Sequence, residues 1–488
     1  MTIRRALLVL LAALVLLAAV LVVRTLQFTP APQPQQPRQT VAVDAQQVAA
    51  HLAEAIRFRT VSYGEAERID YDQFGAFIQW LGQTYPKVHQ VLSRTPINQY
   101  TQLYRWQGTD PSLAPVLLSA HFDVVPVDPG SEALWQHPPF AGVVADGQVW
   151  GRGALDDKGS VVSLMESLTL LIDQGFSPKR TILVALTHDE EIGSRHGAQA
   201  VVAKLKADGI KPAWSLDEGS FILDGVVPGV TQKVASINVA EKGFLTLELV
   251  ARAQGGHSSM PPRETAVGIL AKALVKLQDH PVPGGLDGLS AEMYGTLARN
   301  MGFGKRLLFA NRWLFDPLIT GALEAMPSGN ALLRTTTAPT MLSGSVKANV
   351  LPIEAVGTVN FRLHPRDSAE SVVAYVKEQI QDPRVEVKVT DSMDASRVSS
   401  ADTDGFKALA QASQQSYGQL VVTPGLTLGA TDSRFYDNWA DNAYRFTPMV
   451  LRADEIPLFH GTNERVRIDN LAGAVSFYTL LLTHSCGG

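Results

Sequence analysis

Acidic residues recur along this chain in short glycine-framed motifs, and their spacing constrains the fold more than any other feature. His121 and Asp156 are 35 residues apart, and Asp156 and Glu191 are again 35 apart. One strand–helix unit of an α/β protein occupies roughly 30 residues, so each of these side chains should follow a successive strand. Open α/β sheets bind ligands at the carboxyl ends of their strands. The spacing therefore predicts an α/β domain with a polar site at one edge of its sheet.

Apolar strand-like runs alternate with helical segments through the first half of the chain. This alternation indicates a parallel or mixed sheet with helices on both faces. Asp44 should cap the first helix, and the alternation resumes at Thr403. The expected elements are a helix over 45–58, a strand Val116–Ala120, a helix Lys158–Gln174, a strand Thr181–Thr187, a helix Arg195–Asp208 and a strand Ala213–Asp217.

The pattern changes at residue 242 and indicates a second domain inserted into the first. Its order of elements, β-α-β-β-α-β, is typical of a ferredoxin-like α+β domain. We expect catalytic parts at 41–241 and 395–488 and an inserted lid at 242–394, with an extra stretch at 281–338 that is helical over Glu292–Phe315. The expected elements of the lid are strands Phe244–Ala253, Met341–Ala348, Ala355–Leu363 and Val385–Val389 and helices Glu264–Gln278 and 368–380, the latter capped by Asp367.

The N-terminus carries 18 consecutive apolar residues, Ala6–Val23, between Arg5 and Arg24. At 1.5 Å per residue they form about 27 Å of helix, enough to cross a bilayer core. We expect residues 1–24 to be a transmembrane anchor and the Pro/Gln-rich residues 25–40 a linker. Arginines before the segment place the enzyme outside the cytoplasm, in a periplasmic, lumenal or extracellular space. A cleaved signal peptide, which would give a secreted form, stays open.

Charge and cysteine content exclude other classes of protein. The net charge is −5 and the pI about 6.1, which argues against nucleic acid as a partner. The single cysteine, Cys486, excludes an internal disulfide, and we expect it to lie in a frayed terminus.

The first two motifs contain side chains that a divalent metal site requires. His121 and Asp123 point the same way in an extended chain, so Asp123 can accept the second imidazole N–H. The adjacent carboxylates of Asp156 and Asp157 repel each other if both are charged and unpaired. The charge of one is neutralised if that carboxylate bridges two metal cations, and Lys158 can screen the charge of the other. A solvated acidic turn is the alternative for this pair.

Two further acidic pairs follow the next strands. Glu190 and Glu191 can divide the work between a general base and a metal ligand. Asp217 closes the following strand, and Glu218 comes directly after it. Each pair alone is equally consistent with a helix cap, but together they favour a metal site.

The remaining candidates lie further along the chain: His257, Asn349, Arg362, Asp432, Arg434 and His460. Arg362 falls within an apolar strand, where a guanidinium is costly unless paired. Its planar guanidinium can bind a carboxylate with two hydrogen bonds. That carboxylate is either part of the substrate or part of an internal salt bridge. His257 lies among glycine and serine and is otherwise an ordinary surface histidine.

Nine motifs in this order resemble the di-zinc metallopeptidase/aminoacylase family, over roughly residues 44–484. They are HFD, GRGALDDKG, HDEE, LDEG, GGHSSMPP, NVLP, FRLHP, GATDSR and HGTNE. The family includes aminoacylase, glutamate carboxypeptidase and succinyl-diaminopimelate desuccinylase. Within it, the HDEE motif, the extra stretch and the N-terminal helix look most similar to carboxypeptidase S and the N-fatty-acyl-amino-acid synthase/hydrolases.

The resemblance implies a role for each matching residue. One zinc would be held by His121, Asp156 and Asp217, and the other by His460, Asp156 and Glu191. Asp156 would bridge them, with a cis peptide to Asp157. Glu190 would be the general base and acid, His257 the oxyanion donor, and Arg362 with Asn349 the binding site for the substrate carboxylate. We also count Asp123 among the catalytic residues and Arg434 among the substrate-binding residues.

The expected activity is hydrolysis, open to reversal, of an amide next to a free carboxylate, in a peptide C-terminus or an N-acyl amino acid. The expected cofactors are two Zn²⁺, with Co²⁺ or Mn²⁺ as substitutes, and a homodimer stays open. A non-catalytic receptor or scaffold with a peptidase fold is the alternative. An esterase using Ser258 or Ser259 is disfavoured because the G-x-S-x-G elbow is missing.

Overall fold

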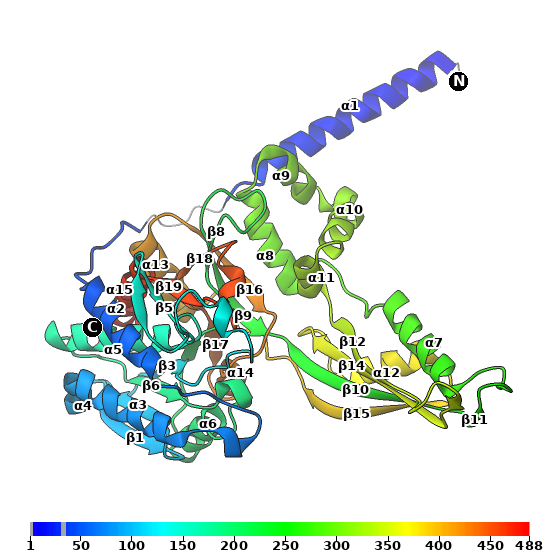
Figure 1. Cartoon of the computed structure of the whole chain (residues 1–488). Helices are drawn as coiled ribbons and strands as arrows, with labels where there is room; N and C mark the ends of the chain where they lie inside the picture. The colour runs from blue at the N-terminus through cyan, green and yellow to red at the C-terminus, as the bar shows by residue number, and fades with distance from the viewer. Residues whose placement is uncertain (1–2, 31–35, 488) are drawn as a thin grey trace.

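Two parts of the chain, before and after an insertion, build one large mixed β-sheet with helices on both faces (Figure 1). This computed structural model describes residues 3–30 and 36–487. The strand order is β1-β2-β6-β3-β7-β17-β9-β8-β18, with β16 paired to β9. The strands are β1 Ser93–Ile97, β2 Thr101–Trp106, β3 Val116–His121, β6 Ile182–Thr187, β7 Trp214–Asp217, β8 Ile222–Asp224, β9 Val234–Glu241, β16 Val421–Thr427, β17 Asn442–Arg445 and β18 Val450–Arg452.

The centre of the sheet is parallel and buried on both faces, which confirms the predicted α/β class. β3 runs parallel to β6 and β7, and β17 is parallel to β7. Alternate residues of β3 enter different cores: Val116 and Leu118 enter the larger core, and Leu117 the smaller one on the other face. The larger core is covered by α2 Ala45–Arg57, α3 Tyr71–Thr84, α4 Pro86–Val91, α5 Lys158–Asp173, α13 Asp404–Tyr417 and α15 Ile468–Cys486, and the smaller one by α6 Ala198–Ala207 and α14 Ser433–Tyr436.

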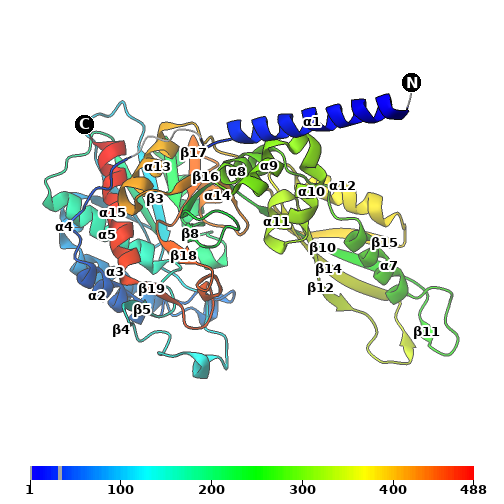
Figure 2. The ribbon, with the colours of Figure 1, turned by 90° about the horizontal axis from the view of Figure 1, so that it is seen from above.

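A second, four-stranded sheet leaves the first domain where β9 ends at Glu241. All its neighbouring strands are antiparallel, in the order β12-β14-β10-β15. The elements along the chain are β10 Gly243–Arg252, α7 Ala266–Asp279, β12 Thr336–Ser343, β14 Glu354–Leu363, α12 Ala369–Ile380 and β15 Val385–Met393. A two-stranded ribbon, β11 Gly256–His257 with β13 Val350–Leu351, lies at the end of this sheet far from the large sheet (Figure 2).

The extra stretch is more helical than expected and is not confined to the inserted domain. It forms α8 Gly288–Arg299, α9 Phe303–Ala310, α10 Arg312–Glu324 and α11 Pro327–Leu333. The helical character predicted over Glu292–Phe315 is confirmed, but it is divided among three helices because the chain breaks at Gly302 and Asn311. Met293 and Leu297 of α8 pack with Val421 of β16, so α8 covers part of the large sheet.

Three element boundaries also differ from the prediction. The strand predicted at Met341–Ala348 lies at Thr336–Ser343, where it pairs with β14. The helix predicted from Arg195 begins at Ala198, since the preceding turn is held by the Asp189 carboxylate, which accepts from the His196 N–H at 2.6 Å. Ser368, not Asp367, caps α12, because its hydroxyl accepts from the Ser371 N–H. Asp44 caps α2 as predicted.

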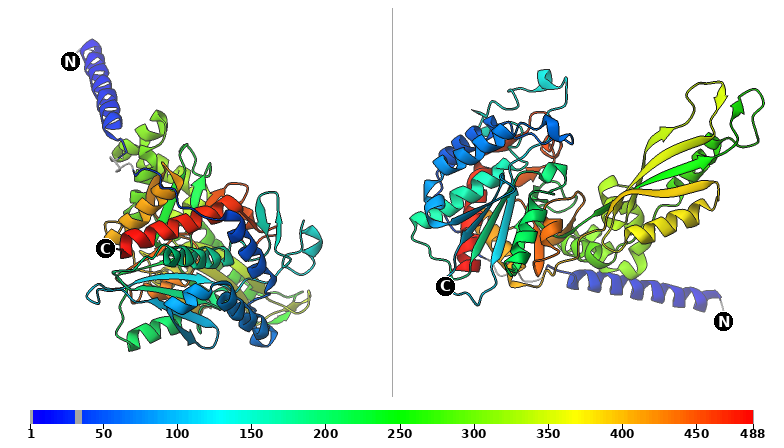
Figure 3. Two further views of the ribbon diagram at one scale, coloured as in Figure 1. Left: turned by 90° about the vertical axis from the view of Figure 1, so that its left-hand side faces the viewer. Right: turned by 90° about the horizontal axis from the view of Figure 1, so that it is seen from below.

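The N-terminal helix α1, Ile3–Gln27, projects from the rest of the molecule (Figure 3). It is long and apolar enough to cross a membrane, and none of its apolar window is buried. It continues three residues beyond the predicted end at Arg24. The described ends of the predicted linker are attached to the fold: Arg299 donates to the Thr29 carbonyl at 2.8 Å, and the Gln39 N–H to the Gln415 carbonyl at 3.0 Å. Linker residues 31–35 lie outside the described part.

The C-terminus is folded, contrary to the expectation that it frays. Helix α15 runs to Cys486, whose side chain is fully buried in the larger core. The Cys486 carbonyl accepts from the Lys179 N–H at 2.6 Å.

Candidate metal centre

Three parallel strands bring the predicted motifs to one edge of the large sheet. β3 ends at His121, which lies opposite Thr187, the last residue of β6. β6 is followed by a 3-10 turn, η3 Glu190–Ile192, and β7 ends at Asp217. The carboxyl ends of parallel strands meet at the same edge, so segments far apart in sequence become neighbours here.

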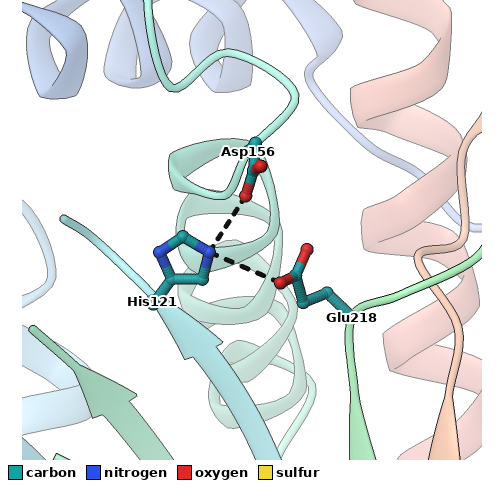
Figure 4. A group of neighbouring side chains, drawn as sticks. All are labelled: His121, Asp156 and Glu218. Carbon is teal, nitrogen blue, oxygen red and sulfur yellow. Dashed lines mark hydrogen bonds and ion pairs between the residues drawn. The ribbon is translucent and has the colours of Figure 1, made fainter. Parts of the chain in front are cut away.

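The first group of possible ligands consists of His121, Asp156 and Glu218 (Figure 4). His121 Nε2 lies 3.0 Å from Asp156 Oδ1 and 3.5 Å from Glu218 Oε1. All three side chains come from different segments and converge on one point. Imidazole nitrogen and carboxylate oxygen in this arrangement are the ligands that zinc prefers.

A second group shares Asp156 with the first. Asp156 Oδ2 lies 2.8 Å from His460 Nε2, which is 3.6 Å from Glu191 Oε2. The two oxygens of Asp156 therefore face two different histidines. Burial alone would raise the pKa of Asp156, but hydrogen bonds with His121 and His460 outweigh it and hold that pKa well below its usual range. The peptide bond between Asp156 and Asp157 is cis, as the resemblance implied.

Asp123 holds two parts of this edge together. Its carboxylate accepts from the N–H groups of Glu190 and Glu191, both at 3.2 Å, and from the Ser62 hydroxyl at 2.7 Å. His121 Nδ1 lies 3.0 Å from the Asp123 carbonyl oxygen and 3.3 Å from its carboxylate. Asp123 thus orients the imidazole, as predicted from the spacing, and also the turn with both glutamates.

Glu218, and not Asp217, has a carboxylate oxygen close to His121 in this structure. Asp217 is the last residue of β7 and is buried, but it is absent from each of the described ligand groups. Successive side chains of a strand point to opposite sides, so only one of this pair can face His121, and that residue is Glu218. Burial and the nearby charge of Asp432 raise the pKa of Asp217 well above its usual value. The structure thus offers Glu218 as an alternative ligand, and the role of Asp217 stays a prediction.

Glu464 and Arg152 organise the loop that carries Asp156, and the sequence analysis missed both. Glu464 Oε1 accepts from the N–H groups of Gly153 at 3.0 Å, Leu155 at 2.9 Å and Asp156 at 3.3 Å. Its Oε2 is 2.6 Å from Arg152, which also donates to the His460 carbonyl at 3.0 Å. The signal available was the position of Glu464, four residues after His460 in the same motif.

Strand pairing explains why these residues meet. A small sheet has the order β19-β5-β4 and consists of β4 Val143–Ala145, β5 Gln148–Trp150 and β19 Arg465–Arg467. β5 and β19 are antiparallel, with Trp150 opposite Arg465. Glu464 consequently lies beside the loop that starts at Gly151. Gly153 has φ of 88°, a conformation that favours glycine.

Lys158 does not screen Asp157, contrary to the prediction. Its ammonium donates to the carbonyls of Ala55 at 3.0 Å and Phe58 at 2.6 Å, on the side of helix α2. Burial lowers the pKa of Lys158 to about 7. The Asp157 carboxylate instead accepts from the His121 N–H at 3.3 Å.

The electrostatics of this edge suit bound cations. Burial raises the pKa of Glu190 well above its usual value and that of Glu191 to about 7, and neighbouring carboxylates add to both shifts. Glu191 Oε1 and Asp217 Oδ2 are buried without a hydrogen-bond partner among the described residues. A dense group of buried carboxylates with spare oxygen atoms costs free energy unless cations neutralise it. The residues present therefore fit divalent metal ions.

The inserted domain does not bring its candidate residues to this edge. His257 is on the distal ribbon (Figure 1), where its Nδ1 is 2.8 Å from the Ser259 hydroxyl. Asn349 lies beside it, with its carbonyl accepting from the Ser258 N–H. Arg362 on β14 is exposed and not buried as expected, because it faces away from the helices that cover the sheet. No carboxylate among the described residues pairs with it.

The loop before α14 brings Arg434 and Asp432 near the same edge. The Thr187 hydroxyl donates to Asp432 at 2.6 Å, which joins this loop to the end of β6. Arg434 is half-buried and packs its guanidinium on the Phe435 ring, 5.0 Å from the centroid.

Comparisons with known proteins find similar sequences along most of the chain. The family model described as Peptidase family M20/M25/M40 matches residues 117–484. The chain is 38% identical to the N-fatty-acyl-amino acid synthase/hydrolase PM20D1 of Xenopus tropicalis, over 97% of this chain and 93% of that protein. It is 39% identical to the probable carboxypeptidase S-like 2 of Dictyostelium discoideum, over 90% and 85% respectively.

Solved structures share the fold at low sequence identity. The M20 family metallo-carboxypeptidase Sso-CP2 of Sulfolobus solfataricus is similar with a TM-score of 0.64 and 19% identity, over 90% of this chain and 99% of that one. Human carnosine dipeptidase 1 is similar with a TM-score of 0.59 and 16% identity, over 90% and 96%.

Proposed function

The chain belongs to Peptidase family M20/M25/M40 and is a hydrolase, and on that premise we propose that it is a di-zinc enzyme for amides next to a free carboxylate. The proposed substrates are N-acyl amino acids first, and peptides with a free C-terminus second. The full-length similarity to an N-fatty-acyl-amino acid synthase/hydrolase and to carboxypeptidase S-like proteins supports this order.

One observation carries the proposal: the two oxygens of Asp156 face different histidines, each accompanied by a further carboxylate. His121, Asp156 and Glu218 would hold one metal ion, and His460, Asp156 and Glu191 the other. Bound divalent ions supply Lewis-acid chemistry, since they acidify water and polarise a carbonyl. Co²⁺ or Mn²⁺ could replace Zn²⁺ at ligands of this kind.

Glu190 is proposed as the group that moves the proton. It lies with Glu191 and His121 in one cluster, and it is not needed in the two ligand sets above. Its carboxylate would accept a proton from the attacking water while the water oxygen bonds to the carbonyl carbon. When the C–N bond breaks, Glu190 would return that proton to the leaving amine. Asp123 acts as a positioning residue, because it holds the Glu190 and Glu191 N–H groups.

The inserted domain is proposed to close over this site as a lid. Glu241 at the end of β9 is fixed by Arg445 at 3.0 Å and Thr431 at 2.7 Å. Lys242 alone separates β9 from β10, and the chain returns to the first domain after Met393, so rotation at these two connections would move the whole lid sheet. Closure would bring Arg362 and Asn349 to the substrate carboxylate and His257 to the developing oxyanion, with Arg434 on the opposite wall.

The N-terminal helix is proposed as an uncleaved anchor with the enzyme outside the cytoplasm. Its length and composition support a membrane span. The hydrogen bonds of its last turn with the folded part support an anchor that stays attached.

The activity can be tested on the full chain in detergent with N-acyl amino acids, their carboxamides and dipeptides, with and without a chelator. Mass spectrometry should show hydrolysis of the free acids, loss of activity with the chelator and recovery with Zn²⁺. Incubation of the free fatty acid with an amino acid tests the reverse reaction. Glu190→Gln is the matched control for a contaminating enzyme. If neither amides nor peptides are cleaved by a metal-loaded chain, the scaffold alternative replaces this proposal.

A further inference from the structure

Helix α10 exposes a broad apolar face that nothing in the described part of the chain covers. Trp313 is 59% exposed, Leu318 61% and Leu314 42%, and Met326, which follows the helix, is also 42% exposed. Pro317 and Ala322 lie between them and are also exposed. The opposite face is buried, where Ile319 and Leu323 join a small core with Leu333. The helix is therefore apolar on both faces, although only one of them packs on protein.

Charged side chains border this face and do not interrupt its middle. Asp316 is bound to Arg312 at 2.7 Å, and Glu324 in the last turn is bound to Arg334. Basic residues dominate the approach to α10: residues 293–315 contain Arg299, Lys305, Arg306 and Arg312 and no acidic residue. An apolar face beside basic residues is typical of a helix that lies in a membrane interface.

The corner between α9 and α10 is also where α1 joins the folded part. Asn311 in this corner is buried, and its amide donates to the Leu21 carbonyl of α1 at 3.1 Å and to the Leu307 carbonyl at 2.9 Å. Arg24 donates to the Ala310 carbonyl at 3.3 Å, and Thr25 is fully buried. Figures 1 and 3 show the corner at the C-terminal end of α1, with α10 beside it.

These contacts fix where the exposed face lies relative to the apolar helix. A helix that emerges from a bilayer places its last turns at the headgroup level. The α9–α10 corner is bonded to those last turns and cannot lie far from the same level. Exposed apolar surface at that depth is removed from water by lipid and needs no protein partner.

We propose that the α9–α10 corner is a membrane-binding surface that lies in the interface of the bilayer crossed by α1. The apolar face of α10 and the exposed Phe303 of α9 would enter the boundary between headgroups and acyl chains. Lys305, whose ammonium also donates to the Pro228 carbonyl at 3.1 Å, would lie at the level of the anionic headgroups. The enzyme would then be held against the membrane in one orientation and not on a free tether. This inference rests on the proposed anchor.

Site-directed spin labels on the full chain test it. Cys486 is the single cysteine and is buried, so Cys486→Ala gives a background for labels at Leu318→Cys and Trp313→Cys. Leu14→Cys on α1 reports the anchor. Leu134→Cys, 68% exposed on the catalytic domain, is the matched control. Hydrolytic activity and unchanged circular dichroism verify that each labelled chain is folded.

The chain is reconstituted in vesicles of phosphatidylcholine with phosphatidylglycerol, and the accessibility of each label to oxygen and to a water-soluble nickel chelate is measured. We expect the labels at 318 and 313 to favour oxygen, as Leu14→Cys does, and the label at 134 to favour the nickel chelate. If the label at position 14 lies in lipid while the labels at 318 and 313 are as accessible to the nickel chelate as the label at 134, the anchor stands and this inference is overturned. If the label at 14 is also in water, the proposed anchor itself fails.

A second copy of the chain is the competing occupant of this face. Spin–spin broadening at 318 that disappears when labelled chains are diluted with unlabelled ones would show a dimer contact and would overturn the membrane assignment. Unchanged line shapes on dilution, together with high oxygen accessibility, support the bilayer as the occupant.

Discussion

Replacing Glu464 by glutamine should destabilise the loop that presents Asp156. Glutamine can still accept from the three loop N–H groups with its carbonyl oxygen. Its amide group would then face Arg152 in place of the carboxylate oxygen that is now 2.6 Å away. Both side chains are buried, at 0% and 3% exposure. Leaving one member of a buried ion pair without its partner costs about 3–5 kcal/mol, and we expect a loss of this size in the free energy of unfolding.

Urea unfolding followed by circular dichroism measures the effect. With an m-value of at least about 3 kcal/mol per molar urea, the midpoint should fall by roughly 1 M. Asp208→Asn is the matched control, since it makes the same chemical change in the exposed pair Lys204–Asp208 and should cost less than about 1 kcal/mol. Adding Arg152→Met to Glu464→Gln removes the unpaired guanidinium and should restore part of the loss.

Two results would refute this reasoning. Glu464→Gln could unfold at the same midpoint as Asp208→Asn, which would mean that the buried pair contributes no more than an exposed one. Alternatively, the double variant could be less stable than Glu464→Gln, which would mean that the unpaired Arg152 is not the cause of the loss.

Three further predictions concern the proton transfer, the lid and the hinge. Glu190→Gln should keep its metal ions and lower kcat by a factor of roughly 10²–10⁴, whereas Glu191→Gln should lose metal. Identical metal contents and rates in the two variants would contradict the assignment of Glu190 to proton transfer and Glu191 to metal binding. Arg362→Ala should remove the preference for free acids over their carboxamides, at about 2–5 kcal/mol in kcat/KM, with unchanged metal content; a wild-type enzyme that shows no such preference rules the clamp out. Burial and the charge of Arg362 lower the pKa of Lys242 from 10.5 to about 7. Between about pH 7 and pH 10.5 the unfolded chain therefore binds more protons than the folded chain, and the free energy of unfolding should rise with pH. Lys242→Met should show a flatter rise of the urea midpoint across that window, and an equal slope in both proteins would count against the lowered pKa.

Most of the site could be predicted because it depends on strand ends. His121 and the Glu190–Glu191 turn do follow adjacent strands of the large sheet, and they converge with Asp156 at one edge. Asp156 itself comes from the loop between β5 of the small sheet and α5, so the equal spacing does not reflect a repeat of strand and helix, and that expectation is wrong. The choice between Asp217 and Glu218 could not be made in this way. It depends on how the chain turns after β7, and adjacent residues at a strand end can exchange roles with a small change in backbone angle.

Residues that act through tertiary contacts were harder to find. Glu464 is separated from Gly153 by 311 residues, and only the pairing of β5 with β19 brings them together. Arg362 was expected to be buried because its strand is apolar, but a sheet covered on one face exposes every second residue. The helices α8–α11 were underestimated because glycine and proline disfavour a helix interior, yet Gly295 and Pro317 lie inside α8 and α10.

The central claim is that one carboxylate serves two metal ions. Anomalous X-ray scattering at the zinc edge, from crystals of the metal-loaded chain, tests it directly. We predict two peaks roughly 3.5–4 Å apart, one near His121 and Glu218 and one near His460 and Glu191, each about 2.0–2.2 Å from an Asp156 oxygen. A single peak, or two peaks of which only one contacts Asp156, would contradict the account.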